Sequence, residues 1–450
     1  MDAHLIDSAV FGHQWSTPES RRLLAEPARI GRWVEVLAAL AGAQAEVGLI
    51  PESAAAAIAG LRDRTWDGAA IEAIAAGTRR TSHSTLGMID VLKGALPAEA
   101  AEWVYYGATV QDVTDTAQVL EVRAVGRLLW RDLRRIEAAL LELARRHRDT
   151  PMVGRTHGQP GAPITFGFKA ATWADEIGRC LDRLAQGRDR WLVGQLAGAV
   201  GVLGFFGSAA LPMQQAYVGR LGLAQPPISW LSTRDRLAEF AQVVASTVTA
   251  LARVANETYA LARAEIGELR EPVADGTVGS ITMPHKRNPE VSEQVVTLAR
   301  LVRSQSAVLT ETMVGEHERD GRTWKTEWVL VPELAHYALA ATAMSVRLVE
   351  GLEVDTDRML ANLTAGGSAS SERLLSVVSV RLGKHRAQAA LQEAYRVART
   401  RGIAVVDALD LTEEEAAELD RVHVGAAGEM VDRVLARAAE RRDALGEDWA

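Results

Sequence analysis

The side chains best suited to chemistry gather in residues 275–289, which read DGTVGSITMPHKRNP. Two glycines make this segment flexible, two prolines exclude helix, and Lys286 and Arg287 place positive charge beside hydroxyl groups such as that of Ser280. A mobile loop that closes over an anionic substrate needs this combination. The alternative is an ordinary surface loop, but about 15 structureless residues between two long helices are uncommon without a function. The segment therefore predicts a lid that carries catalytic groups.

Residues 106–112, YGATVQD, form a second polar island directly before a long helical pattern. Thr109, Gln111 and Asp112 bring a hydroxyl, an amide and a carboxylate to the start of that helix. On pattern alone the favoured interpretation is a capped helix start, in which Thr109 or Asp112 binds free backbone N–H groups. A substrate-binding role for the same groups is the alternative.

Residues 154–160, GRTHGQP, form a third island that holds Arg155, Thr156, His157 and Gln159 between helix breakers. A carboxylate-binding pocket uses such donors, and an imidazole can exchange a proton near neutral pH. A polar turn between two helices, with a histidine that hydrogen-bonds only locally, fits the pattern equally well. Both interpretations stay open at this point.

The elements that must position these islands are long helices. Between residues 117 and 148, Leu120, Leu129 and Leu133 belong to an apolar series at three- and four-residue steps that stops before Pro151. Similar patterns cover residues 234–269, 291–314 and 330–352, and no run has the alternation and turn residues of a hairpin. We therefore predict an all-α fold with a helical segment at 1–104, a central long-helix bundle at 105–352 and a third helical segment at 353–450.

The composition of the 450 residues excludes several classes of protein. Fifty basic and 58 acidic residues are spread without a basic tract, which argues against nucleic-acid binding. Cys180 is the single cysteine, so we predict no disulfide, no metal site, no cofactor and a reducing cytoplasmic location. The N-terminus lacks the pattern of a secretory signal, and the uncharged stretch at residues 194–220 is too rich in glycine for a membrane span. We expect no membrane partner.

Taken in their order along the chain, residues 106–112, 154–160 and 275–289 resemble, in sequence and spacing, the three signature regions of the fumarase/aspartase superfamily. The third region of that family has the form GSSxMPxKxNP, and this chain reads GSITMPHKRNP, departing only at Ile281. The resemblance covers most of the chain. It implies a homotetramer whose long helices form a common bundle, and active sites that each combine the three regions from three different subunits.

The resemblance also implies a reaction, anti β-elimination, and a role for each region. Ser280 matches the general base, and His157 matches the general acid toward the leaving group. Thr109, Thr156, Lys286 and Asn288 match groups that stabilise the carboxylate after its α-proton is removed. Gln111, Arg155, Gln159 and Met283 lie in the same regions and are expected to bind a small dicarboxylate substrate. The hydroxyl of Ser280 is a weak base, so nearby cations and N–H groups must favour its alkoxide.

The branch of the superfamily, and so the substrate, is less well defined by the sequence. Residues 316–328, EHERDGRTWKTEW, look most like the 3-carboxy-cis,cis-muconate cycloisomerase group, in which a lactone is made or opened. The segment Thr81-Ser82-His83 resembles adenylosuccinate lyases instead, where His83 would be catalytic, although a structural role fits it as well. The Arg-Tyr pair and the serine cluster with which adenylosuccinate lyases bind phosphate are both missing.

We therefore expect a substituted succinate, of the amino- or nitrosuccinate type, that loses its nitrogen group to give fumarate. Cycloisomerisation ranks second, and adenylosuccinate cleavage ranks third. Arg319 and Arg322 are candidates to bind the distal carboxylate, because arginine pairs with carboxylates in a bidentate manner. Trp324 and Trp328 either line the pocket or pack in the core, and packing is favoured. A purely structural role is disfavoured, since Ser280 and its partner groups are all retained.

Overall fold

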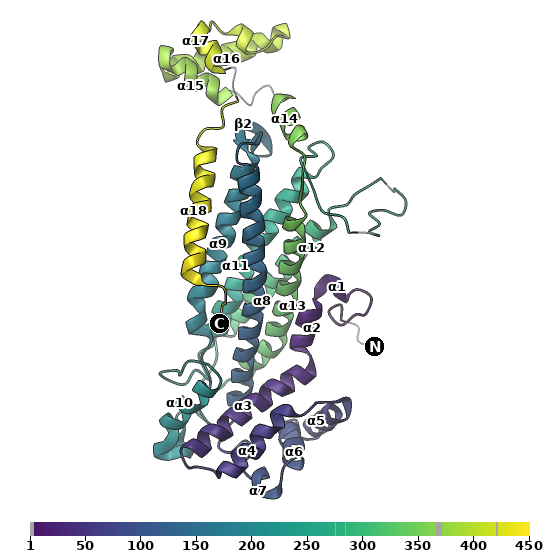
Figure 1. Ribbon diagram of the computed structural model, residues 1–450, viewed down its shortest axis with the longest axis vertical. Helices are drawn as coiled ribbons and strands as arrows, with labels where there is room; N and C mark the ends of the chain where they lie inside the picture. Colours follow the sequence, from purple (N-terminus) through teal and green to yellow (C-terminus); the bar gives the residue numbers. More distant parts are fainter. Residues whose placement is uncertain (1–3, 275, 284, 366–370, 420–421) are drawn as a thin grey trace.

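The computed structural model describes residues 4–274, 276–283, 285–365, 371–419 and 422–450. Asp275 and Pro284, both in the expected lid, lie outside these ranges. The molecule is predominantly helical, and its long helices run along the longest axis (Figure 1). The central bundle contains α8 (Val110–Arg146), α9 (Phe166–Trp191), α11 (Asp235–Leu261), α12 (Glu290–Glu311) and α13 (Gly321–Glu350).

Shorter helices lie beside the middle of the bundle and at one end of it, the lower end in Figure 1. They are α1 (Gly12–Trp15), α2 (Pro18–Leu24), α3 (Glu26–Glu46), α4 (Glu52–Gly60), η1 (Leu61–Asp63), α5 (Gly68–Thr81), α6 (Leu86–Gly94), α7 (Ala98–Ala101), η2 (Gly204–Ala209) and α10 (Ala210–Arg220). Helix α3 packs against both α8 and α10, which joins this group to the bundle.

Helix α8 confirms the helix that periodicity predicts over residues 117–148. Its leucine series is buried, including Leu120, Leu129 and Leu133, and Arg131 on the opposite side is exposed. The helix begins earlier than expected, at Val110, because the Asp112 carboxylate accepts the backbone N–H of Thr109 at 2.9 Å. It ends at Arg146, ahead of Pro151. The capped helix start that the YGATVQD pattern favours is therefore present.

The other predicted helices form with shifted ends. Helix α11 stops at Leu261, short of residue 269, because Gly267 adopts a positive φ of 63° and Glu268 turns into the interior. Helix α13 begins at Gly321, well before residue 330, because the Asp320 carboxylate caps it by accepting the backbone N–H of Arg322 at 2.9 Å. Helix α12 follows its predicted range closely.

The prediction that no hairpin is present is wrong at the third island. Strands β1 (Pro151–Thr156) and β2 (Gln159–Thr165) pair antiparallel, with Thr156 opposite Gln159 and Met152 opposite Ile164. The two tip residues, His157 and Gly158, both have positive φ, 54° and 73°, as the twist of a two-residue hairpin turn requires. A His-Gly turn lacks the Asn-Gly or Asp-Gly signal, so the pattern did not reveal it. Strands β3 (Leu269–Arg270) and β4 (Glu353–Val354) form a second, minimal pair.

The chain after the bundle divides into two parts in space. Helix α14 (Thr356–Ala365) packs against β1 at the hairpin end of the bundle. Beyond it lie α15 (Ser371–Leu382), α16 (Lys384–Arg401), η3 (Val406–Ala408) and α17 (Glu413–Leu419), and α15 and α16 share a small core of their own. Helix α18 (Ala427–Leu445) instead runs back along α9 (Figure 1). Trp449 completes this return, since its indole N–H donates to the Leu184 carbonyl at 3.0 Å.

Helices α11 and α13 are long and apolar enough to cross a membrane by length and composition alone. Within each, 67% of the most apolar window is buried inside the protein, which is the burial expected of core helices in a bundle.

Candidate active site

Arg319 organises one end of the bundle, which we call the Arg319 end. Its guanidinium donates to the Thr109 hydroxyl at 2.8 Å and to the carbonyls of Gly198 and Ala199 at 3.2 and 3.0 Å. Among the ion pairs of the described residues, none includes Arg319. The charge of Asp112 acts on Arg319 from nearby, but no described carboxylate bonds to the guanidinium, which stands at the N-terminus of α8, where the helix dipole also favours an anion.

Asp112 holds the backbone around Arg319 in place. Its carboxylate is buried and accepts the N–H groups of Thr109, Ala197 and Gly198 at 2.9, 2.8 and 3.2 Å. Burial raises the pKa of Asp112 to about 7, although these three N–H groups and Arg319 pull it down. Asp112 thus links the start of α8 to the glycine-rich segment whose carbonyls bind Arg319.

The other predicted residues at this end have different surroundings. Gln111 is fully buried, and its amide donates to the Leu231 carbonyl at 2.9 Å, so it anchors α8 to the segment before α11. The Arg322 side chain is 71% exposed and pairs with Asp320 and Glu316. His83 is exposed, and its Nδ1 accepts the N–H of Leu86 at 3.2 Å at the start of α6. That contact is compatible with a structural role for His83 and leaves the catalytic alternative open.

Strained backbone marks the same region. Five non-glycine residues of the described chain have positive φ. One of them, His157, lies elsewhere, in the turn of the β1–β2 hairpin. The others are Ser82, Tyr105, Leu203 and His317. Each belongs to a segment that adjoins the Arg319 end, namely the one before α6, the one before Thr109, the glycine-rich segment and the one before Arg319. Such conformations cost free energy and persist where the surrounding structure requires them, often at functional sites.

The opposite end of the bundle, which we call the His157 end, presents the β1–β2 hairpin. Thr156, His157 and Gln159 are exposed at its tip. Arg155 is committed inside the chain, because its guanidinium pairs with the buried Glu268 at 2.9 and 2.6 Å, and Asn362 donates to the same carboxylate. Arg155 therefore ties the hairpin to the segment after α11 instead of facing outward with its neighbours.

The predicted lid also lies at the His157 end, ahead of α12 (Figure 1). Ser280 Oγ accepts the N–H of Met283 at 3.0 Å, and the Asn288 amide donates to the Gly279 carbonyl at 2.8 Å. Lys286 is exposed and makes no hydrogen bond or ion pair with another described side chain. The lid turns apolar groups outward, with Ile281 94% and Met283 42% exposed. These exposed groups leave one face of the lid uncovered within a single chain.

The three regions do not meet within one chain. Helix α8 spans 37 residues, so Thr109 and the hairpin that follows α8 are separated by about 55 Å. Across the described residues, no hydrogen bond or ion pair connects the hairpin tip with Ser280 or Lys286. Thr109 and Arg319 thus form one half of a potential site, and the hairpin and lid form the other.

Sequence reasoning missed a buried ionic cluster beneath the Arg319 end. The Arg234 guanidinium binds Asp115 at 2.7 Å and Glu327 at 2.9 Å, and all three side chains are at most 1% exposed. It joins the N-terminal parts of α8 and α13 to the start of α11. The sequence offered one signal for this cluster: acidic residues stand at positions of the helical patterns where apolar core residues are expected. Within the described ranges, no group of three or more His, Cys, Asp or Glu side chains is arranged to hold a metal ion.

Comparisons with known proteins agree with this architecture. A family model described as Lyase matches residues 14–303. The chain is 39% identical to N-acetyl-S-(2-succino)cysteine lyase of Dickeya dadantii, over 86% of this chain and 85% of the relative. It is 37% identical to nitrosuccinate lyase of Streptomyces davaonensis, over 98% of each. A crystal structure of 3-carboxy-cis,cis-muconate lactonizing enzyme from Pseudomonas putida superimposes with a TM-score of 0.88 at 32% identity, covering 96% of this chain and 100% of that one. The chain therefore belongs to this lyase family, within the fumarase/aspartase superfamily that its three motifs resemble.

Proposed function

We propose that the protein cleaves a substituted succinate by anti β-elimination and releases fumarate. The observation that carries the proposal is Arg319, an arginine with no acidic partner among the described residues, which sits on the Thr109 hydroxyl at the start of α8. A carboxylate is the ligand that such a cation and helix N-terminus bind best. We assign the distal carboxylate of the substrate to Arg319 in preference to Arg322, which already pairs with two carboxylates.

Ser280 is proposed as the base that removes the proton α to the other carboxylate. The electron pair left on that carbon forms the new double bond as the bond from the β-carbon to the leaving group breaks. Ser280 already accepts the N–H of Met283, and the unpaired Lys286 lies six positions further along the same lid. Both groups favour an alkoxide at Ser280, which a serine base requires. Lys286, Asn288 and Thr156 are proposed to stabilise the charge that develops on the carboxylate.

His157 is proposed to protonate the leaving group. It lies exposed at the hairpin tip, which supports a role outside its own chain. Since the hairpin is about 55 Å from Thr109 within one chain, and the lid also lies toward the hairpin end of the bundle, we propose that a homotetramer brings the halves together from different subunits. The same arrangement would cover the apolar residues that the lid exposes. Gln159 and Met283 are expected to contact substrate in this assembled site.

The leaving group is proposed to depart through nitrogen or sulfur, as the names of the relatives suggest. Cycloisomerisation is the second candidate, because a lactonizing enzyme shares the fold closely. Adenylosuccinate cleavage ranks third, because the phosphate-binding residues of that group are missing. A cytoplasmic location fits all three.

The test is direct. The protein is incubated separately with nitrosuccinate, aminosuccinate, an S-(2-succino) thioether and 3-carboxymuconate, and the ultraviolet absorbance of fumarate or of the muconate is followed. Fumarate from any succinate, abolished in Ser280→Ala, supports the proposal. Lactone formation alone would refute it in favour of the cycloisomerase, and no reaction with any compound would refute both.

A further inference from the structure

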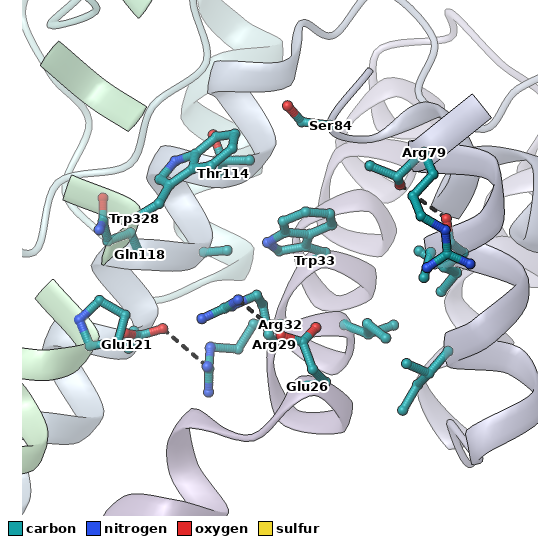
Figure 2. A pocket seen from close by; sticks show the side chains of 17 residues that line it. Glu26, Arg29, Arg32, Trp33, Arg79, Ser84, Thr114, Gln118, Glu121 and Trp328 are labelled. Carbon is teal, nitrogen blue, oxygen red and sulfur yellow. Dashed lines mark hydrogen bonds and ion pairs between the residues drawn. The ribbon is translucent and has the colours of Figure 1, made fainter. Parts of the chain in front are cut away.

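A cavity of about 540 Å³ separates the N-terminal helices from the bundle. Helices α3 and α5 form one wall, and α8 and α13 form the other (Figure 2). Its lining is largely apolar and includes Ile74, and Trp33 lies across the space from Trp328 (Figure 2). A volume of this size is typical of a site for a small organic molecule and far exceeds the space of one water. Trp328 thus lines a pocket, whereas Trp324, buried against it, packs in the core.

Three polar atoms on the α8 wall of this cavity have no hydrogen-bond partner among the described residues. They are Thr114 Oγ1, Gln118 Oε1 and Glu121 Oε1, and the three side chains are 5%, 8% and 5% exposed. Their spacing along α8 places them on one face, which Figure 2 shows beside Trp328. A buried acceptor without a donor costs about 1–3 kcal/mol, so a ligand that brings donors into the cavity would gain stability from this row of atoms.

The character of these atoms defines what the ligand must offer. The Gln118 amide N–H already donates to the Glu327 carbonyl, and the second oxygen of Glu121 accepts from Arg32 at 3.1 Å. The free atoms of both residues are therefore acceptors, and they require N–H or O–H donors. The guanidiniums at the rim, Arg29 and Arg79, are paired with Glu26 and Glu72. The cavity therefore does not call for a phosphate or a second strong anion.

The cavity adjoins the Arg319 end. Thr114 follows Thr109 by five positions on α8, about 7.5 Å along the helix axis. Trp328 lies on α13, which begins just after Arg319, and Ser84 of the lining directly follows His83. Thr114 and Gln118 face away from the side of α8 on which Asp112 binds Ala197 and Gly198, so a molecule whose carboxylate binds Arg319 would pass over the N-terminus of α8 to enter the cavity.

We propose that this cavity binds the leaving group of the substrate, and that the leaving group is a thiol or amine whose apolar body carries an amide or similar N–H donor. The inference rests on the proposed function and narrows its substrate class. A nitro or unsubstituted amino group would leave the indole walls and the row of acceptors on α8 unused.

The test compares two thioethers that differ only in the leaving group, S-(2-succino)-N-acetylcysteamine, whose leaving thiol carries a neutral amide, and 2-(methylthio)succinate. In the wild type, kcat/KM for the larger substrate should exceed that for the truncated one by at least about tenfold, since the truncated one lacks the hydrogen-bonding amide. Thr114→Val and Gln118→Leu should each lower this ratio by about fivefold to tenfold, because each removes one polar partner from the site. Thr400→Val on the distant α16 is the matched control and should keep the wild-type ratio.

Ala75→Phe provides a second variant that alters no buried polar group. Its ring would enter the cavity from α5 and should lower the same ratio, even if one of the α8 variants folds poorly. A ratio near one in the wild type, or a ratio that none of the cavity variants changes, would overturn the inference while fumarate release still supports the proposed function. Absence of fumarate from both thioethers and from nitrosuccinate would count against the proposed function itself.

Discussion

Replacing Arg319 with methionine isolates the positive charge on which the carboxylate assignment depends. Methionine retains an unbranched side chain of similar reach and removes the three hydrogen bonds of the guanidinium to Thr109, Gly198 and Ala199. Each such bond contributes about 1 kcal/mol net, so the fold should lose roughly 1–3 kcal/mol and remain assembled.

Arg319→Met should raise the activation free energy of the reaction by more than a typical single hydrogen bond contributes to folding. A charge-assisted pair with a substrate carboxylate, in a site closed to water, is worth about 3 kcal/mol, which corresponds to roughly two orders of magnitude in kcat/KM. Arg319→Lys retains the charge but loses the bidentate geometry, so it should fall between wild type and Arg319→Met. Arg322→Met is the matched control, because Arg322 is exposed and held by Asp320 and Glu316.

The assay is steady-state release of fumarate from the best substrate, with thermal unfolding of each variant measured alongside. We expect Arg322→Met to stay within about twofold of wild type, since exposed ion pairs contribute little. A folded Arg319→Met with nearly normal kcat/KM, or an Arg322→Met that is equally impaired, would show that the substrate carboxylate is bound elsewhere.

Three further predictions concern Ser280, Asp112 and His157. Ser280→Ala should reduce turnover by several orders of magnitude while the oligomer, measured by light scattering, stays intact; loss of the oligomer would make the role of Ser280 structural. The pKa of Asp112 is raised to about 7, so its protonation stabilises the fold at low pH, and this contribution is lost as the pH rises from about 4 through about 7. Urea unfolding across that range should therefore lose part of its pH dependence in Asp112→Asn, and identical slopes for variant and wild type would contradict the assignment. His157→Asn should slow poor leaving groups more than good ones, and an equal loss for both would remove the general-acid role.

The helices could be predicted because periodicity and helix breakers are local signals. The α8 pattern and Pro151 fixed one bundle helix to within a few residues at its C-terminal end. Caps and tertiary contacts moved the other ends. Asp320 starts α13 early, and the inward turn at Glu268 ends α11. Such contacts join residues far apart in the sequence, which periodicity does not report.

The residues of the candidate site could be predicted only in part, for the same reason. Motifs identified Thr109, His157 and Ser280 as candidates, but Arg319 meets Thr109 across 210 positions, and Arg155 turns away to Glu268. No residue pattern distinguishes Arg319 from Arg322. In the structure, Arg322 pairs with two carboxylates, whereas Arg319 forms no ion pair with a described residue. The acceptors at Thr114, Gln118 and Glu121 look like ordinary helix positions until the cavity beside them is seen.

The central claim is that each active site combines the Arg319 end of one chain with the His157 end of others. Chains with Ser280→Ala and chains with Arg319→Met should each be nearly inactive alone. When the two are produced together, and mixed oligomers are isolated with two different affinity tags, some sites should combine an intact Ser280 with an intact Arg319. We predict fumarate release well above the sum of the two parents. Activity no higher than that sum, in oligomers proven to be mixed, would contradict the account.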